Sequence, residues 1–406
     1  MAIRLRQPRN IEEYHGALRG IGHYFGGGWT VEDAERFSQQ LPFDRTIAVL
    51  DGDAVVAGAG AFPFELSIPG GTLPCAGVTV VGVQPTHRRR GILGRMMQAQ
   101  LDDVRERGEP IAALWASEET IYGRFGYGLA AQDVMIRASR VHAAMHPSVP
   151  AKIGTTRLLS HDDALKVFPR IYDRVRRTTP GFVSRSKAWW EFRKLDDRPE
   201  RRRGGGELNR VLLEIDGRPV GYALYRIKVE FENATNKSSV EVLEAIGDSP
   251  VAVRELWRYL LGVDWMDSIV CELLPADHPL FLLVQRPNRL DWKVFDGLWL
   301  RLVDLPAALS ARSVAADGRV TFEVTADPIF ADNVGTWTVE NGRARRTSRR
   351  ADLRLDVQAL ACAYLGGFTF ADLVRAGRVE EVARGGVARA DALYHVPARP
   401  WCPEIF

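Results

Sequence analysis

The sequence predicts a mixed α+β protein in which one α/β unit occurs twice and a smaller α+β domain follows. Three observations support this fold class. A hairpin, a strand, a helix and a further strand follow one another in the first part of the chain, the same order returns in the middle, and short strands and helices share the last part. The repetition indicates an internal duplication. A chain of 406 residues, 46% hydrophobic and 26% charged, has room for roughly two to four domains.

Composition excludes several classes of protein. The 54 basic and 51 acidic residues leave a net charge of +3, whereas nucleic-acid binders usually carry a stronger positive bias. The sequence contains no apolar run of the ~18 residues needed for a membrane span, and its first residues lack the apolar core of a signal peptide. The cysteines form no CxxC pair, so we expect no metal site and a cytoplasmic protein with reduced thiols.

The first unit shows its elements through caps, turns and β-branched segments. Thr30 and Asp33 can form a capping box at the start of a helix. Asp51-Gly52 between β-rich segments predicts a hairpin in which both turn residues adopt positive φ. We then expect a strand over residues 78–83, a helix over residues 91–107 and a strand over residues 111–115.

The second unit repeats this order around the Asp216-Gly217 hairpin. It has Ala245-Ile246-Gly247-Asp248 where the first unit has an arginine-rich turn, so the copies are expected to share a scaffold but not a site. A strand over residues 296–302 is expected to open the third region. The predicted domains are residues 1–140, 141–290 and 291–406.

The turn after the third strand of the first unit carries the strongest functional signal. It reads Val81-Gly82-Val83-Gln84-Pro85-Thr86-His87-Arg88-Arg89-Arg90-Gly91-Ile92-Leu93-Gly94. A strand ends and a helix begins there, so free N–H groups and the positive end of the helix dipole meet in a small space. Guanidinium groups suit phosphate oxygens, and we expect a pyrophosphate ligand. An isolated Arg-Arg-Arg-Gly segment is more often a solvated basic turn, but the flanking strand and helix favour the phosphate site.

This turn resembles the acetyl-CoA pyrophosphate loop of the GNAT superfamily of acetyltransferases, although Leu93 stands where that pattern has glycine or alanine. Neither GxxxxGK[ST] nor GxGxxG fits the spacing. A narrower set of motifs, found in all three regions, is similar to the enhanced intracellular survival (Eis) family. These motifs are the arginine turn, Ala116-Ser117-Glu118, Ile121-Tyr122-Gly123-Arg124-Phe125-Gly126-Tyr127-Gly128, Gly221-Tyr222-Ala223-Leu224-Tyr225-Arg226 and Asp296-Gly297-Leu298-Trp299-Leu300-Arg301.

The Eis resemblance implies tandem GNAT folds, one active and one degenerate, followed by a sterol-carrier-protein-like α+β domain. It also implies assembly as a homo-hexamer and transfer of an acetyl group from acetyl-CoA to primary amines, best known for aminoglycosides. The acetyl-CoA-binding residues that it implies are Val81, Gly82, Val83, Arg89, Arg90, Gly91, Ile92, Leu93, Gly94, Ser117 and Glu118.

A general acid must protonate the departing CoA thiolate, and a tyrosine is a neutral donor at pH 7. The resemblance assigns this role to Tyr122. Tyr127 lies in the same block, and without the resemblance the two tyrosines are equal candidates.

A general base must take a proton from the attacking ammonium group. His87 is a candidate by its chemistry, although its place in the phosphate turn favours a loop role. The resemblance implies the C-terminal carboxylate, here that of Phe406, in a segment that by itself would be a frayed tail. An α-carboxyl has a reference pKa of about 3.3–3.7 and is a weak base unless burial raises that value.

We therefore expect an N-acetyltransferase that acts on a small polyamine or aminoglycoside-like substrate. Ile405 and the loop His23–Trp29 lack the carboxylates that aminoglycoside-acetylating relatives tend to carry, with Glu404 as a candidate substitute. Two alternatives stay open: a protein or peptide lysine acetyltransferase, and a non-catalytic acyl-CoA- or lipid-binding protein.

Overall fold

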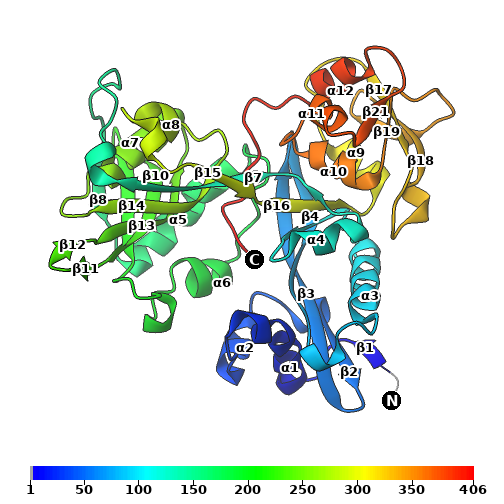
Figure 1. The fold of residues 1–406 in the computed structure, drawn as a ribbon, viewed down its shortest axis with the longest axis horizontal. Helices are drawn as coiled ribbons and strands as arrows, with labels where there is room; N and C mark the ends of the chain where they lie inside the picture. Colours follow the sequence, from blue (N-terminus) through cyan, green and yellow to red (C-terminus); the bar gives the residue numbers. More distant parts are fainter. Residues whose placement is uncertain (1–2) are drawn as a thin grey trace. The chain divides into compact units, whose positions relative to one another are not determined.

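The computed structural model describes residues 3–406 and divides into two compact units. The first unit comprises Met1–Ala131, Gly297–Pro397 and Glu404–Phe406, and the second comprises Gln132–Asp296 and Ala398–Pro403. Figure 1 shows the helices and strands of each unit in chain colours. The chain thus leaves the first unit after Ala131 and returns to it at Gly297.

Within the described residues, a seven-stranded sheet in the order β1-β2-β3-β4-β5-β16-β6 forms the centre of the first unit (Figure 1). Its neighbours pair antiparallel except β4 and β5, which are parallel. The strands are β1 (Ile3–Arg6), β2 (Thr46–Asp51), β3 (Ala54–Ile68), β4 (Gly71–Val83), β5 (Ile111–Trp115), β16 (Leu298–Leu302) and β6 (Gly128–Leu129). The helices are α1 (Ile11–Gly22), α2 (Val31–Ser38), α3 (Ile92–Glu106) and α4 (Glu119–Tyr122).

Helices α1 and α3 cover opposite faces of this sheet. Gly58 and Gly82 let α1 approach closely, because a Cβ on Gly58 would lie 2.4 Å from Ala17 O and one on Gly82 would lie 2.3 Å from Ile21 N. On the other face α3 buries Met96, among other side chains. At α2, the capping box of Thr30 and Asp33 is present, which confirms that prediction.

Strand β16 corrects the expectation that residues 296–302 open the third region. It pairs with β5 on one side and β6 on the other, inside the first sheet. Conversely β7 (Gln132–Ser139), which lies within the predicted first domain, pairs with strands of the second sheet. Apolar periodicity reveals a strand but not its long-range partner. The domain limits at residues 140 and 290 therefore remain predictions.

The second unit is built on another seven-stranded sheet among the described residues, in the order β15-β7-β14-β13-β10-β9-β8. Its other strands are β8 (Thr155–Leu158), β9 (Asn209–Ile215), β10 (Arg218–Lys228), β13 (Ser239–Gly247), β14 (Ser268–Pro275) and β15 (Lys293–Asp296), and a small ribbon is formed by β11 (Phe231–Glu232) and β12 (Thr235–Asn236). The helices are α5 (His161–Arg176), α6 (Lys187–Trp189), α7 (Pro250–Leu261) and α8 (Leu280–Leu283).

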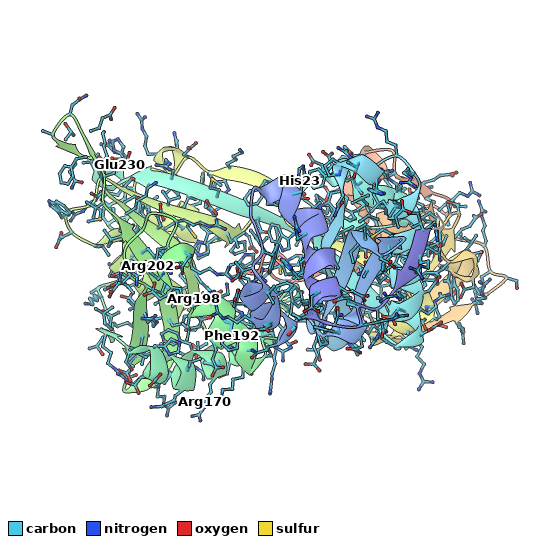
Figure 2. All side chains as sticks on the ribbon, turned by 90° about the horizontal axis from the view of Figure 1, so that it is seen from below. His23, Arg170, Phe192, Arg198, Arg202 and Glu230 are labelled. Carbon is cyan, nitrogen blue, oxygen red and sulfur yellow. The ribbon has the colours of Figure 1, made fainter. Side chains whose placement is uncertain are left out.

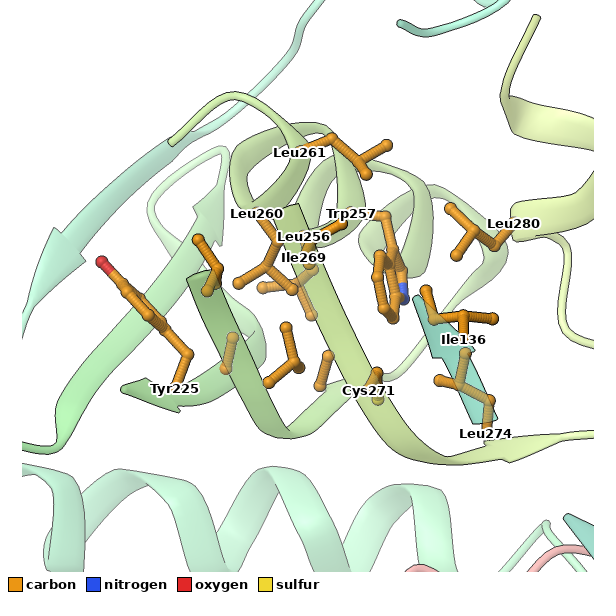
Figure 3. Packing of buried hydrophobic residues seen from close by; sticks show 14 of the residues in the cluster. Ile136, Tyr225, Leu256, Trp257, Leu260, Leu261, Ile269, Cys271, Leu274 and Leu280 are labelled. Atoms are coloured by element: carbon orange, nitrogen blue, oxygen red, sulfur yellow. The ribbon is translucent and has the colours of Figure 1, made fainter. Parts of the chain in front are cut away.

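Alternate residues of this sheet face α7 and α5. Trp257 of α7 packs with Ile269 of β14 in one buried cluster, which Figure 3 shows at close range. On the opposite face, Phe168 of α5 stacks on Tyr222 of β10 with ring centroids 4.5 Å apart. The two-sided burial follows from the two-residue period of a strand that helices cover on both faces.

The remaining part of the first unit is a five-stranded sheet in the order β19-β18-β17-β20-β21 with four helices, all within the described residues. The strands are β17 (Arg319–Val324), β18 (Gly335–Glu340), β19 (Arg343–Arg346), β20 (Leu353–Leu355) and β21 (Val379–Glu381). The helices are α9 (Leu305–Ala311), α10 (Val357–Tyr364), α11 (Phe370–Arg375) and α12 (Gly386–Tyr394). Helices α10 and α11 are among the short helices that the sequence predicts for the last part of the chain.

The two Asp-Gly hairpins turn differently. Asp216 and Gly217 have φ values of 52° and 72°, as predicted for a two-residue turn with both residues left-handed. In the first unit Asp51 pairs with Ala54 instead, so the turn residues are Gly52 and Asp53, and of these Gly52 has positive φ, at 64°. The expectation of positive φ at Asp51 is therefore wrong, because the register is displaced by one residue.

Arginines of the loop that follows α6 are tied to aspartates, and Figure 2 labels Arg198 and Arg202 among them. Arg198 Nη2 lies 2.8 Å from Asp196 Oδ2, and Arg202 Nε lies 3.3 Å from Asp197 Oδ1. These guanidinium groups have carboxylate partners within their own loop, which fits a surface loop rather than a second phosphate site.

Candidate active site

Strand β4 separates from β5 where the predicted site begins. The parallel pairing of β4 with β5 ends at Gly77 and Ala113, although both strands continue. A bulge accompanies the separation: the register with β3 shifts between Gly58 and Gly60, and Val80 has a φ of 49°. Positive φ is strained for a β-branched residue, and such strain clusters at functional sites. The β5-facing edge of β4 beyond Gly77 is thereby left open to a ligand.

The turn between β4 and α3 presents backbone N–H groups. Arg89 and Gly91 have φ values of 61° and 73°, a left-handed geometry that helps to form an anion-binding nest of N–H groups. Gly91 is the N-cap of α3, and no side chain caps this helix start. The first N–H groups of α3 and its positive dipole end are therefore available to a phosphate.

A cavity of about 950 Å³ brings these features together. Its size lies within the range of ligand pockets. It contains every predicted acetyl-CoA-binding residue except Arg90, and it also contains the predicted acid Tyr122. The predicted residues among its lining are Val81, Gly82, Val83, Arg89, Gly91, Ile92, Leu93, Gly94, Ser117, Glu118 and Tyr122.

The arginine turn divides its side chains between the cavity and the surface. Arg88 and Arg89 line the cavity, whereas Arg90 does not, and its Nη1 lies 3.5 Å from Asp51 Oδ2. His87 Nε2 also lies near Asp51 Oδ2, at 3.3 Å. Arg90 was predicted to bind acetyl-CoA, but its side chain lies outside the cavity, because in a tight turn successive side chains point in different directions. The contacts of His87 fit a loop role.

Tyr122 and Tyr127 occupy different environments. Tyr122 ends α4, lines the cavity and makes no hydrogen bond through its hydroxyl within residues 3–406. Burial raises its pKa to about 12. Tyr127 is fully buried, lies outside the cavity lining and has a hydroxyl without a partner among the described residues. Burial raises the pKa of Tyr127 as well. Of the two phenols, Tyr122 is the one placed to meet a ligand.

Comparisons with known proteins identify the domains of the chain. Two family descriptions, each "Acetyltransferase (GNAT) domain", match residues 7–130 and 181–302, and "Sterol carrier protein domain" matches residues 305–403. The chain is 38% identical to an uncharacterized N-acetyltransferase of Streptomyces avermitilis over 94% of both proteins. It is 34% identical to N-acetyltransferase Eis of Mycobacterium tuberculosis, over 89% of this chain and 90% of that protein.

The chain belongs to the Eis family of N-acetyltransferases. A crystal structure of Eis1 from Mycobacterium abscessus has the same fold, with a TM-score of 0.87 and 31% identity over 99% of this chain and 100% of that one.

Membership of the Eis family confirms the predicted fold class of two GNAT domains followed by a sterol-carrier-like domain. It makes the chain an acyl-CoA-dependent N-acetyltransferase, and the GNAT fold implies acetyl-CoA as co-substrate. The alternative of a non-catalytic lipid-binding protein is not supported.

Residues 3–406 contain neither a metal-binding cluster nor a membrane-spanning helix. This part of the chain has no cluster of three or more His, Cys, Asp and Glu side chains that could hold a metal ion. It also has no helix that is long and apolar enough to cross a membrane.

The C-terminal residues are ordered rather than frayed. Phe406 is 8% exposed, and its ring meets that of Phe64 edge-on at 5.1 Å, while Ile405 is 50% exposed. The segment before them packs in the second unit, where Trp401 N donates to Pro180 O at 2.9 Å. Phe406 is not part of the cavity lining, so the structure does not bring it into one cavity with Tyr122.

Sequence reasoning missed Tyr24 and Phe25 as cavity residues. Tyr24 donates from its hydroxyl to Val83 O at 2.8 Å, and the Arg88 guanidinium lies 5.7 Å from its ring centroid. Both aromatic side chains are exposed, at 45% and 67%. The signal in the sequence was the pair of aromatics beside Gly26-Gly27-Gly28, since exposed aromatics next to a glycine loop often contact ligands.

Proposed function

We propose that the chain transfers the acetyl group of acetyl-CoA to a primary amine of a small polyamine or aminoglycoside-like substrate, by direct attack of the amine. Tyr122 acts as general acid and the terminal carboxylate of Phe406 as general base. The observation that carries the proposal is the Tyr122 hydroxyl, which has no hydrogen-bond partner within residues 3–406 and lines the same cavity as the open β4 edge and the uncapped start of α3.

The chain supplies binding, polarisation and protons, and acetyl-CoA supplies the activated acyl group. Backbone N–H groups at the open edge over Val81–Val83 can polarise a thioester carbonyl and stabilise its oxyanion. Arg88, Arg89 and the α3 N-terminus hold the pyrophosphate.

With a pKa of about 12, Tyr122 keeps its proton at pH 7. A thiol in water is the stronger acid, with a reference pKa near 8.5. A dry site raises the pKa of a thiol as well as that of a phenol, so the departing thiolate is a stronger base there than in water.

The terminal carboxylate would accept the proton that the attacking ammonium group loses. Support for this role comes from the Eis family and from the burial of Phe406 in the unit that carries the cavity. The ring of Phe406 contacts that of Phe64 on β3, the strand that pairs with β4.

The proposed class of amine acceptor follows the Eis family, but the charge of the cavity lining does not favour a polycation. The cavity has three arginines, Arg88, Arg89 and Arg124, and its one carboxylate is Glu118. Glu118 Oε1 already accepts a hydrogen bond from Thr120 at 2.6 Å. The lining of this cavity therefore offers a polycation little complementary charge, and the panel of amines below tests whether spermidine or an aminoglycoside is the better substrate.

The test of the acid is Tyr122→Phe, assayed by CoA release with a panel that includes spermidine and one aminoglycoside. We expect kcat to fall by ~10²–10⁴-fold while CoA affinity is retained. Tyr259→Phe, which also removes a hydroxyl but lies in the second unit, is the matched control. A wild-type kcat for Tyr122→Phe, or a slower Tyr127→Phe enzyme, contradicts the assignment.

The test of the base uses the chain end. Residues appended after Phe406 turn its carboxylate into an amide, and deletion of Phe406 moves the carboxylate ~3.3–3.6 Å back along the chain. Both variants should bind CoA normally and transfer slowly. Equal rates for the native, extended and shortened chains would show that the base lies elsewhere.

The same family membership leads us to propose a homo-hexamer in the cytoplasm. Sedimentation of the purified protein tests the assembly, and fractionation of its native cells tests the location.

A further inference from the structure

The glycines of the block from Tyr122 to Gly128 each meet a residue from the C-terminal part of the first unit. A Cβ on Gly123 would lie 2.6 Å from Gln358 Nε2, one on Gly126 would lie 2.9 Å from Arg301 Nη1, and one on Gly128 would lie 2.2 Å from Gln358 O. The glycine spacing therefore reflects close packing of the segment that follows the proposed acid.

Arg301, which meets Gly126, is itself held in place. Its side chain is completely buried, and Nη2 donates to Asp327 Oδ1 at 2.5 Å. Asp327 is fixed in turn, because it also accepts from the N–H groups of Ile329 and Phe330 at 2.9 Å and from Asn333 Nδ2 at 2.8 Å. The guanidinium therefore has little freedom to move.

The flat face of this guanidinium lies against Gly126. A Cβ there would be 2.9 Å from Nη1, 3.0 Å from Cζ and 3.1 Å from Nε of Arg301. Gly126 has a φ of 83° and reverses the chain, with its N–H donating to Gly123 O at 2.9 Å and the Tyr127 N–H to Tyr122 O at 3.3 Å. The turn that returns the chain from Tyr122 thus rests on Arg301.

Stability alone does not account for this arrangement. Nε and Nη1 of Arg301 have no hydrogen-bond partner within residues 3–406, and a buried donor without a partner is unfavourable. Burial raises the pKa of both tyrosines, and at Tyr127 the charge of Arg301 opposes this rise. The contact of Arg301 with this block is its packing against Gly126.

We propose that Arg301 is a positioning residue for Tyr122: its guanidinium, anchored on Asp327, supports the Gly126 turn and so fixes the direction of the Tyr122 hydroxyl in the cavity. The inference rests on the proposed acid role of Tyr122. It gives the sterol-carrier-like domain, which carries Asp327, a part in the acetyl transfer.

The test compares Gly126→Ala with Gly108→Ala. Gly108 also has a left-handed φ, 72°, but an added Cβ meets nothing within 4 Å, so this control carries the backbone strain without the contact. Gly126→Ala should lower kcat by about 10–100-fold, since a misplacement of ~1 Å can cost ~10²-fold. CoA affinity should stay within about twofold, and Gly108→Ala should keep the wild-type kcat.

The decisive measurement repeats Gly126→Ala in the Tyr122→Phe background. If Arg301 acts through Tyr122, the second substitution causes no further loss of kcat. Arg301→Lys, which keeps a charge for Asp327 but not the flat guanidinium, should behave in the same way and replaces Gly126→Ala should that variant fail to fold.

A further loss of the same size in the Tyr122→Phe background, or wild-type kcat for both Gly126→Ala and Arg301→Lys, overturns the inference and leaves the acid role intact. Full activity of Tyr122→Phe alone overturns the acid role, and the inference falls with it.

Discussion

The two GNAT copies differ most at the junction between a strand and the following helix, β4–α3 in the first copy and β13–α7 in the second. In the first copy β4 ends at Val83, an arginine turn follows, and α3 starts at a left-handed glycine without a side-chain cap. In the second copy β13 runs to Gly247, and α7 starts almost at once with Ser249 as N-cap, its side chain accepting from Ala252 N, and Pro250 in the first turn. The second helix satisfies its own N–H groups, and the first leaves them for a ligand.

The strands that precede these junctions, β4 and β13, have similar edges. In both copies the parallel pairing stops part-way, after Gly77 in β4 and after Val242 in β13, and a bulge accompanies it. In the second copy, however, Glu244 beyond the bulge is bonded by Arg185 and Tyr222 and lies 2.9 Å from Lys194 Nζ. The side chain of Glu244 thus has its polar partners within the protein.

This comparison teaches that a duplicated fold keeps its scaffold more easily than its site. Opposed glycines occur in both sheets, Gly58 with Gly82 against α1 and Gly221 with Gly247 against α7, where a helix packs closely. The phosphate turn and the proton donor have no such packing role. α8, the counterpart of α4, ends on Leu283 rather than on a tyrosine.

The largest expected effect concerns the arginine turn. Arg88→Ala with Arg89→Ala should weaken CoA binding by about 10²-fold or more, since each charge-assisted contact is worth about 1.5–3 kcal/mol and 1.4 kcal/mol is tenfold. Arg90→Ala is the control, because Arg90 faces Asp51 instead of the cavity. Competition binding measures both variants, and an Arg90→Ala effect as large as that of the double variant would place Arg90 back in the site.

A smaller effect concerns Asp133, a buried residue of the second unit that should influence the stability of the protein but not CoA binding. Burial raises the pKa of Asp133 to about 8, with Trp401 opposing and Asp296 adding to the rise. The folded state thus holds a proton that the unfolded chain loses near pH 4, so stability falls as pH rises from about 4 to 8.

Asp133→Asn removes this loss. The variant should melt a few degrees higher than the wild type at pH 8, with a smaller difference at pH 5, since 1 kcal/mol shifts the melting temperature by about 2–4 °C. CoA affinity should be unchanged. Equal differences at the two pH values, followed by calorimetric melting, would mean that Asp133 does not titrate in this range.

The smallest expected effect concerns Ser249, the N-cap of α7 in the second copy. Ser249→Ala should cost about 1 kcal/mol of stability, which chemical denaturation can measure, and should leave kcat and CoA affinity unchanged. Acquisition of a weak CoA site by this variant would show that the cap alone suppressed binding in the second copy.

Local chemistry could be predicted from the sequence, and long-range placement could not. The cap at Thr30 and the helix after Gly91 follow from spacing and turn residues, whereas the role of Gly82 was implied by the family resemblance. The strand predicted over residues 296–302 corresponds to β16. Its insertion between β5 and β6 was not predicted, because pairing depends on contacts far apart in the chain.

The site shows the same division. The sequence identified the block that contains Tyr122. It could not distinguish Tyr122 from the fully buried Tyr127, because the two differ in burial. The direction of Arg90 depends on the turn geometry after Arg89, whose φ is 61°. The support that Arg301 gives to Gly126 joins residues from β16 and the turn before β6, and no local pattern reveals it.

The central claim is that one GNAT copy binds acetyl-CoA and the other is closed. Calorimetric titration of the whole chain with CoA tests this most directly. We predict one site per chain, at the arginine turn of the first copy. Two sites per chain, or one site with an affinity that the Arg88→Ala and Arg89→Ala substitutions leave unchanged, would contradict it.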